Sequence, residues 1–202
     1  MAYACPVNLD RDRLEAEVRS LYARVAEAPD GDFHFHRGPV FAAERLGYDR
    51  DALARLPDEV TASFAGVANP HAIHPLAEGE VVLDIGSGTG TDLLIAAQAV
   101  GRTGRAIGVD FTASMRARAR AAAADLPQVE VLEGDAMQLP LAEGSVDVVV
   151  SNGVLNLTPD KWVAFGEIAR VLRPGGRLQL ADIVVASELS EGIRSDIDLW
   201  AA

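Results

Sequence analysis

The spacing of apolar residues predicts two parts of this chain with different secondary structure, which divide near residue 77. From Leu9 to Ala28 apolar residues recur every three or four positions, which indicates a helix with one apolar face, ended by Pro29-Asp30-Gly31. From Asp32 to Leu76 seven glycines and prolines divide the chain, which favours short helices packed over another part of the molecule. We therefore expect residues 1–76 to form a helical cap.

Beyond residue 77, continuous apolar runs alternate with helical patterns. The runs expected to form strands are Val81–Ile85, Ala106–Val109, Val129–Leu132, Val146–Val150 and Leu178–Val185. The expected helices are Thr91–Val100, Thr112–Ala124 and Pro159–Leu172. Alternating strands and helices predict a parallel sheet with right-handed crossovers, and unbroken apolar runs predict that both faces are covered. The expected fold class is α/β, with residues 77–202 forming the sheet domain.

The loop after the first predicted strand carries the clearest chemical signal. In VVLDIGSGTGTDLL, Asp84 is followed by Gly86, Gly88 and Gly90. Glycines allow positive φ and let a ligand lie against bare backbone, and the N-terminus of the next helix favours anionic groups. The spacing is G-x-G-x-G, whereas the dinucleotide-binding pattern would place its third glycine at Thr91.

Two further acids follow the next strands. Asp110 ends the second strand, 20 residues after Gly90, where a carboxylate can accept both ribose hydroxyls of an adenosine. Asp135 follows the third strand, where an acid can receive an adenine amino group. Ordinary turn or cap roles are the alternative for both acids. Because the carboxyl ends of parallel strands meet at one edge, the three strand ends predict a single crevice.

As a set, VVLDIGSGTG, GVD (108–110), GDA (134–136) and RVLRPGGRL (170–178) resemble the class I, Rossmann-like, S-adenosylmethionine-dependent methyltransferases, over about residues 79–186. The resemblance implies S-adenosylmethionine (SAM) as cofactor. It implies that Asp84, Gly86 and Gly88 lie against the methionine end, Asp110 against the ribose, and Asp135 with Ala136 against the adenine. The remaining residues of the expected cofactor site are Ser87, Gly90, Phe111 and Ser151.

A finer resemblance, to the arsenite methyltransferases, covers FAGVANP (64–70), LPLAEGSVDVVVSNGVLNLTPDK (139–161) and IRSDIDLW (193–200). Those enzymes methylate trivalent arsenic held by cysteine thiolates, and the resemblance implies cysteines at three positions. Here Val67 and Gly153 occupy the first two, and the third follows Ala202. Valine and glycine supply no soft ligand, and Cys5 lies far away in sequence. We expect methyl transfer to arsenite or another small soft nucleophile such as a thiol or selenol, or else a SAM-binding remnant without catalysis.

The acceptor side of this expected site rests on two asparagines. Displacement by a soft lone pair depends on positioning and water exclusion more than on a strong base. The resemblance places Asn152 and Asn156 beside the transferable methyl group, so we predict that they shape the acceptor pocket. A purely structural turn role is the alternative.

The end of the chain raises a separate expectation. The resemblance implies a further helix and two antiparallel strands after the fifth strand, and few residues follow Val185. We expect these C-terminal strands to be missing, which would leave Leu178–Val185 at an open sheet edge suited to self-association. The alternatives are a truncated product, a covering partner, or a selenocysteine at position 203 read as a stop.

Charge and composition exclude several classes of partner. The net charge of −12 argues against nucleic acid and against anionic membrane surfaces. No run is long enough to span a membrane, and MAYACPVNLD is unlike a signal segment. The single cysteine fits a reducing compartment, so a cytoplasmic location is predicted.

Histidines and arginines gather in two other places. His34, His36, His71 and His74 could suggest a metal site, but polar loop residues around aromatic packing are the interpretation we adopt, with no metal predicted. The arginines of the alanine-rich helix, Arg116, Arg118 and Arg120, are expected to form a solvated face.

Overall fold

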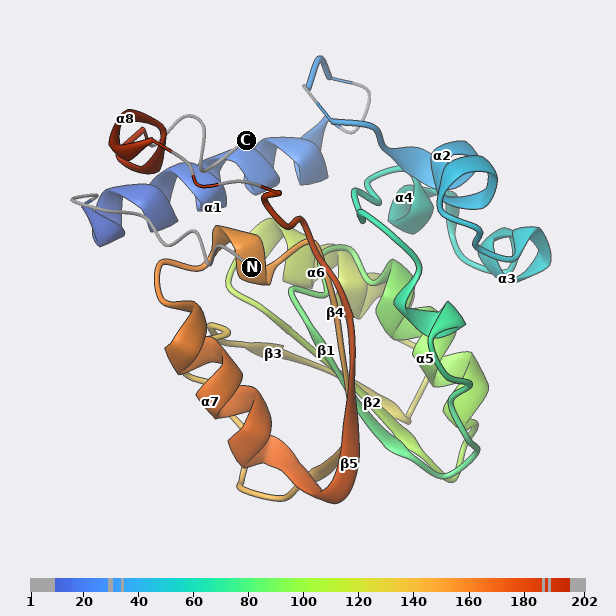
Figure 1. Cartoon of the computed structure of the whole chain (residues 1–202). Coiled ribbons are helices and arrows are strands. Elements are labelled where there is room, and N and C mark those ends of the chain that lie inside the picture. The colour runs from blue at the N-terminus through green and yellow to red at the C-terminus, as the bar shows by residue number, and fades with distance from the viewer. Residues whose placement is uncertain (1–9, 29–30, 34, 187, 189, 197–202) are drawn as a thin grey trace.

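Five parallel strands form one sheet in the computed structural model, which describes residues 10–28, 31–33, 35–186, 188 and 190–196. The strands are β1 (Val81–Ile85), β2 (Arg105–Asp110), β3 (Val129–Glu133), β4 (Val146–Asn152) and β5 (Leu172–Ala181). Their order is β3-β2-β1-β4-β5, so the chain switches direction across the sheet between β1 and β4 (Figure 1). The predicted α/β fold with a parallel sheet is confirmed, and a crevice is expected at this switch point.

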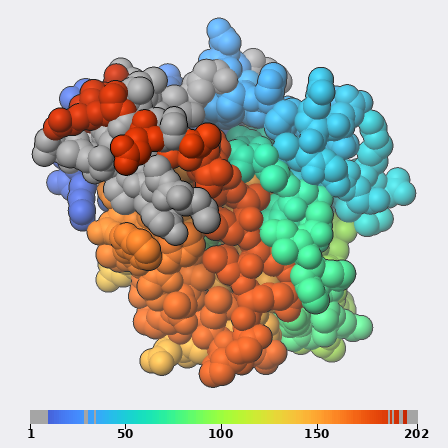
Figure 2. Space-filling view, in the orientation of Figure 1, coloured from blue at the N-terminus to red at the C-terminus, as the bar shows by residue number. Residues whose placement is uncertain are grey.

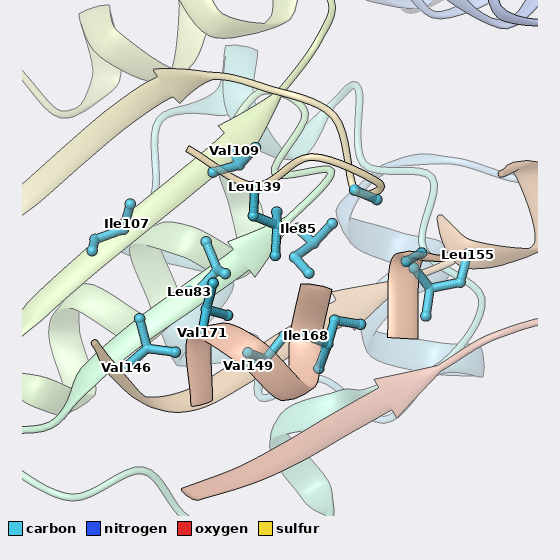
Figure 3. Packing of buried hydrophobic residues seen from close by; sticks show 12 residues of the cluster. Leu83, Ile85, Ile107, Val109, Leu139, Val146, Val149, Leu155, Ile168 and Val171 are labelled. Carbon is cyan, nitrogen blue, oxygen red and sulfur yellow. The ribbon is translucent and has the colours of Figure 1, made fainter. Parts of the chain in front are cut away.

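Helices cover both faces of the sheet, as the unbroken apolar runs predicted. One side carries α5 (Thr91–Val100) and α6 (Ala113–Ala122), and the other carries η2 (Leu155–Leu157) and α7 (Lys161–Val171). On the α5 side, Val82 and Val148 pack against Leu93. On the α7 side, Leu83 and Val149 belong to a cluster with Ile168 (Figure 3). Alternate strand residues therefore point into two separate cores.

The N-terminal segment is a series of helices, as its glycines and prolines predicted. It comprises α1 (Arg11–Glu27), α2 (Gly38–Arg45), α3 (Arg50–Ala54), α4 (Asp58–Thr61) and η1 (Pro70–Ala72). Helix α1 lies over the carboxyl ends of the strands (Figure 1). Figure 2 shows the atoms of the segment that contains α2 to α4, in light blue and cyan, at the upper right of the molecule. The carbonyl of Val60 accepts the hydroxyls of Thr89 (2.8 Å) and Thr91 (3.3 Å), which joins this segment to the glycine loop.

The predicted limits of the fifth strand were wrong. β5 begins at Leu172, passes through Pro174-Gly175-Gly176 beside a register shift in β4, and ends at Ala181 rather than Val185. The Asp182 carboxylate accepts the backbone N–H of Ile183 (2.7 Å), and this local bond replaces continued sheet pairing. Ile183 and Val184 are consequently 58% and 82% exposed.

The edge position of the fifth strand is as predicted, since β5 pairs only with β4 among the described residues. Pairing of this edge with another chain stays a prediction. The last described element is α8 (Glu191–Arg194), and residues 197–200 of the IRSDIDLW segment lie outside the described part of the chain, as does Cys5. None of the described helices has the length and apolarity that crossing a bilayer requires.

Candidate cofactor and acceptor site

Two adjoining hollows form one elongated crevice at the carboxyl edge of the sheet. The first is bordered by the glycine loop, α1, residues 63–66 and the end of β4, and the second by α1 and the ends of β2 and β3. The residues that line both are Val18, Gly86, Asp110, Phe111, Val154 and Leu157. The crevice therefore lies at the switch point of the sheet, where α/β proteins bind ligands.

The glycine loop is fixed by its own backbone bonds. Gly86 and Gly88 have φ of 67° and 54°, a region that other residues rarely adopt. A Cβ on Gly86 would lie 2.4 Å from the Val154 side chain, so no side chain fits there. The N–H groups of Gly86 and Ser87 donate to the Val109 carbonyl (2.8 and 3.2 Å). The loop thus gives a ligand close access to rigid backbone.

Asp110 connects the two hollows. Its carboxylate accepts the N–H of Gly88 (2.9 Å) and of Thr112 (2.7 Å), so the strand end and the glycine loop are joined through one side chain. Burial raises the pKa of Asp110, and the two backbone donors partly offset this effect. Asp110 therefore caps its own turn, which is the alternative role, and it also lies in the crevice, where the sequence predicted it.

Arg116 corrects the expectation of a solvated arginine face. Its side chain is buried, and its guanidinium donates to the Asp110 carbonyl (3.1 Å) and to Glu133 Oε2 (2.7 Å). Arg120 also bonds inward, to the Val131 carbonyl (2.8 Å). Arg120 nevertheless stays exposed, as expected, whereas Arg116 turns inward to the strand ends, where the Asp110 carbonyl and the Glu133 carboxylate accept its N–H groups. Arg116 therefore joins the ends of β2 and β3.

Asp84 is the most enclosed acid of the site. It is 2% exposed and lines the first hollow, and its Oδ2 has no hydrogen-bond partner among the described residues. Burial and the neighbouring charges of Asp92 and Asp110 raise its pKa well above the usual range. A buried carboxylate oxygen without a donor fits a ligand that brings a cationic or N–H group to this point.

The second hollow contains the predicted adenine-end residues. Asp135 and Ala136 line it, and one Asp135 oxygen accepts the N–H of Met137 (2.6 Å) as in a turn. Helix α1 adds Glu15, which the sequence analysis did not identify. Burial and the nearby charge of Asp135 raise the pKa of Glu15. The apolar face of α1 could have indicated that this helix covers a site, but not which polar residues border it.

Asn152 lies at the centre of a polar network in the first hollow. Its Oδ1 accepts the N–H of Val67 (2.8 Å), and its Nδ2 donates to the Tyr48 hydroxyl (3.0 Å) and to Asp92 Oδ2 (3.0 Å). Asp92 Oδ1 also accepts the Tyr48 hydroxyl (2.6 Å) and lies 3.0 Å from His71 Nε2. Tyr48, His71 and Asp92 were not among the predicted site residues, because they come from separate segments.

Three predicted site residues do not line either hollow. The Asn156 backbone N–H donates to Asp182 (3.1 Å), and its amide nitrogen faces Asp182 Oδ1 at 2.7 Å, which matches the structural turn alternative. Ser151 is fully buried in β4, between Ile85 of β1 and Leu180 of β5. Gly90 caps the start of α5.

The two positions where the resemblance implies cysteines lie next to each other. A Cβ on Gly153 would lie 3.1 Å from Val67 Cγ1, so the valine side chain occupies the space beside the glycine. Gly153 lines the first hollow, together with Phe64 and Ala65. This end of the crevice is therefore apolar, with Asn152 and Asp92 at its border.

The three histidines that the structure describes have different partners. His71 faces Asp92, whereas His74 Nδ1 faces the Pro75 carbonyl (2.8 Å) and His36 stacks on Phe41. His34 lies outside the described residues. Among the residues that the structure describes, no group of three histidine, cysteine or acidic side chains could bind a metal ion.

Acidic residues determine the charge of the crevice. The acids that line the two hollows are Glu15, Asp84, Asp92, Asp110 and Asp135, and no lysine, arginine or histidine lines either hollow. Such a field attracts positively charged ligands. SAM carries a sulfonium and an ammonium group, so the unpaired Asp84 oxygen, the bare glycine loop and this field together fit it.

Comparison with known proteins agrees with this geometry. A family model described as "Methyltransferase domain" matches residues 76–202. The arsenite methyltransferase of Halobacterium salinarum is 44% identical over 94% of this chain and 52% of its own length, and that of Homo sapiens is 33% identical over 93% and 52%. A crystal structure of an arsenic(III) S-adenosylmethionine methyltransferase from Chlamydomonas reinhardtii superposes with a TM-score of 0.68, at 38% identity, over 74% of this chain and 53% of the other.

The chain spans about half the length of these relatives. The family-model match nevertheless covers all five strands of the sheet. The chain therefore belongs to the methyltransferase domain family, and its Rossmann-like crevice takes S-adenosylmethionine as cofactor.

Proposed function

We propose that this chain transfers the methyl group of SAM to a small soft nucleophile in the first hollow, namely arsenite, a thiol or a selenol. The bound cofactor would supply an electrophilic methyl group on a sulfonium sulfur. The observation that carries the proposal is the apolar lining of the first hollow at Phe64, Ala65 and Gly153, in the same crevice as the glycine loop.

The cofactor contacts follow from the positions of the acids. The unpaired oxygen of Asp84 would receive the methionine ammonium group, with Gly86, Ser87 and Gly88 beneath the methionine chain. Asp110 would accept the ribose hydroxyls, since it borders both hollows. Residues at the adenine end would be Phe111, Asp135 and Ala136.

The acceptor is proposed from the residues around Gly153. Arsenite methyltransferases are the relatives that match most of this chain, which favours a soft acceptor. Val67 and Gly153 offer no thiolate, so an arsenic acceptor would have to bring its own thiol ligands. A thiol or selenol needs no metal-like coordination and suits the apolar wall of Phe64 and Ala65. Asn152 would border this acceptor, whereas Asn156 would support its loop.

Methyl transfer from radiolabelled SAM tests the proposal directly. Arsenite with and without added thiol, 2-mercaptoethanol and a small selenol are offered in parallel, and SAM binding is measured by calorimetry. Labelled methyl product with at least one acceptor is expected. SAM binding without transfer to any of them would instead support the second candidate, a cofactor-binding chain without catalysis, which the missing thiols at positions 67 and 153 favour.

A further inference from the structure

Asp92 is a buried carboxylate that the proposed cofactor contacts leave unused. It is 6% exposed, lies in the first turn of α5 and lines the first hollow. Four groups face it from four other elements: Tyr48, His71, Asn152 and the acid Asp84. Tyr48 donates its hydroxyl to Asp92, and burial with the Asp92 charge raises the pKa of Tyr48, so this phenol remains a donor.

The charge of the crevice restricts which acceptor can enter. Five acids and no basic side chain line the two hollows. An anionic thiolate would be repelled by this field, because like charges at short range cost several kcal/mol. A free thiol titrates at about 8.5, so at neutral pH it reaches the site mainly with its proton attached. Its proton must then be removed inside the crevice.

We propose that the acceptor enters as an uncharged thiol, with its S–H group intact, and that Asp92 takes its proton as the methyl group arrives. This inference rests on the proposed function. The S–H bond breaks and its proton passes to the Asp92 carboxylate. The electron pair freed on sulfur forms the new bond to the methyl carbon, and the pair of the broken carbon–sulfonium bond stays on the departing thioether, which becomes neutral.

The other two acids of the first hollow are committed elsewhere. Asp110 borders both hollows, on the side of the proposed ribose, and its two oxygens, like those of Asp92, already accept hydrogen bonds. Asp84 faces the methionine end and is more enclosed than Asp92. Asp92 instead bonds to Asn152, which directly precedes the Gly153 wall of the acceptor end. It is therefore the carboxylate nearest in the network to the proposed acceptor.

The proton that Asp92 takes from the acceptor could pass on to His71. Its Nε2 lies 3.0 Å from Asp92 Oδ1, and its Nδ1 is buried with no hydrogen-bond partner among the described residues. An imidazole can take a proton on one nitrogen and release one from the other. His71 does not line the hollow, so it acts through Asp92 as a positioning residue.

Asp92→Asn tests the inference with two small acceptors, and the exposed Asp125→Asn is the charge-matched control. 2-Mercaptoethanol is protonated at pH 7, whereas thioacetate is already ionised. Asp92→Asn should lower kcat for 2-mercaptoethanol about 100-fold or more, the usual contribution of a general base. For thioacetate the variant should leave kcat unchanged and lower KM, since one repelling charge is gone. Equal losses with both acceptors would show that Asp92 only supports Tyr48 and Asn152, and would overturn the inference.

His71→Gln keeps a donor toward Asp92 but cannot carry a proton. We expect a smaller fall in kcat for 2-mercaptoethanol and a changed kcat–pH profile, with SAM affinity retained. A lower melting temperature with an unaltered pH profile would assign His71 a purely structural role.

Binding without turnover separates this inference from the proposed function. In protein loaded with S-adenosylhomocysteine, calorimetry should detect binding of 2-mercaptoethanol but not of thioacetate. The Asp92→Asn variant should show a smaller difference in affinity between the two acceptors. A wild-type chain that binds SAM but transfers its methyl group to none of the offered acceptors, arsenite and the selenol included, would refute the proposed function and the inference with it. Equal affinity for the neutral and the ionised acceptor in the wild type would refute the selection of an uncharged acceptor.

Discussion

Val67 and Gly153 are separated by most of the sheet domain in sequence, yet a Cβ on Gly153 would lie 3.1 Å from the valine side chain. Sequence resemblance identified these as two thiol positions without indicating that they adjoin. Their contact means that the side chain at position 67 and the lack of one at position 153 together determine the local shape of the chain beside the first hollow. Under the proposed function, these two residues would therefore influence the choice of acceptor together.

Replacing both residues with cysteine should restore a soft-metalloid site. We expect Val67→Cys/Gly153→Cys, in a Cys5→Ser background, to bind arsenite at least about tenfold more tightly than the wild type, because two adjacent thiolates are soft donors. Calorimetry with arsenite measures the change. Val67→Ala/Gly153→Ala is the matched control, since it imposes the same backbone cost at the φ of 68° of Gly153. Equal arsenite affinity in the two double variants would contradict the expectation.

The charge of Asp84 should appear in the pH dependence of stability. Because its pKa is raised in the folded chain, its stabilising contribution is present in full below the ordinary value of 3.8 and is lost as the pH rises through the raised native value. Asp84→Asn is uncharged at every pH, so the ligand-free variant should melt at a higher temperature than the wild type at neutral pH but not at acidic pH. Melting curves across pH test this, and a constant difference between the two proteins would argue against it.

At the scale of elements, the crevice depends on side chains that join neighbouring strand ends. Arg116 of α6 bonds to the last residues of both β2 and β3. Asn152 of β4 bonds to the N-terminal segment at Val67 and to α5 at Asp92. These links come from buried polar groups that need partners, so the elements are positioned by hydrogen bonds as well as by apolar packing.

Removing the Arg116 link should weaken cofactor binding. Arg116→Met keeps much of the side-chain volume but removes both bonds, so we expect about a tenfold loss of SAM affinity, equal to about 1.4 kcal/mol. Arg118→Met, on the same helix and more exposed, is the matched control. Calorimetric titration with SAM compares the two. If Arg118→Met weakens binding as much as Arg116→Met, the strand-end link is not the cause.

At the scale of the whole molecule, the crevice has the same sign of charge as the chain. The chain has a net charge of −12, and the hollows are lined by acids without basic residues. This arrangement favours a cationic methyl donor over its neutral product, which helps product leave after transfer. The mobile counter-ions of the buffer oppose such a preference.

Thermal stabilisation by ligands should report this preference. SAM at 100 times its Kd should stabilise the chain by about 2.7 kcal/mol, and S-adenosylhomocysteine at the same concentration should stabilise it less. The difference between the two ligands should shrink as salt is added, because screening weakens the field. Differential scanning calorimetry at two salt concentrations measures it. A larger shift with the neutral product would rule out charge selection.

The local pattern of the sequence determined the architecture and the residues of the proposed cofactor side of the site. Apolar runs such as Val81–Ile85 specify buried strands by their own composition, and the Gly86-Ser87-Gly88 turn needs glycine whatever surrounds it. Acids at strand ends, Asp110 among them, are brought together by the parallel topology alone. These features depend on neighbouring residues or on the order of strands, so they can be derived before any tertiary contact is known.

Only the tertiary structure brought together the residues of the proposed acceptor side of the site. Tyr48, His71, Asp92 and Asn152 meet from four segments, and no periodicity in the sequence relates them. Arg116 faces inward although its helix pattern is that of a solvated surface, because the strand ends beneath it offer acceptors. The fifth strand stops at Ala181, where the Asp182 carboxylate accepts the N–H of the next residue, Ile183, and the N–H of the distant Asn156. In each case a long-range or side-chain hydrogen bond outweighs the local pattern, since a buried polar group without a partner costs more free energy than local propensity supplies.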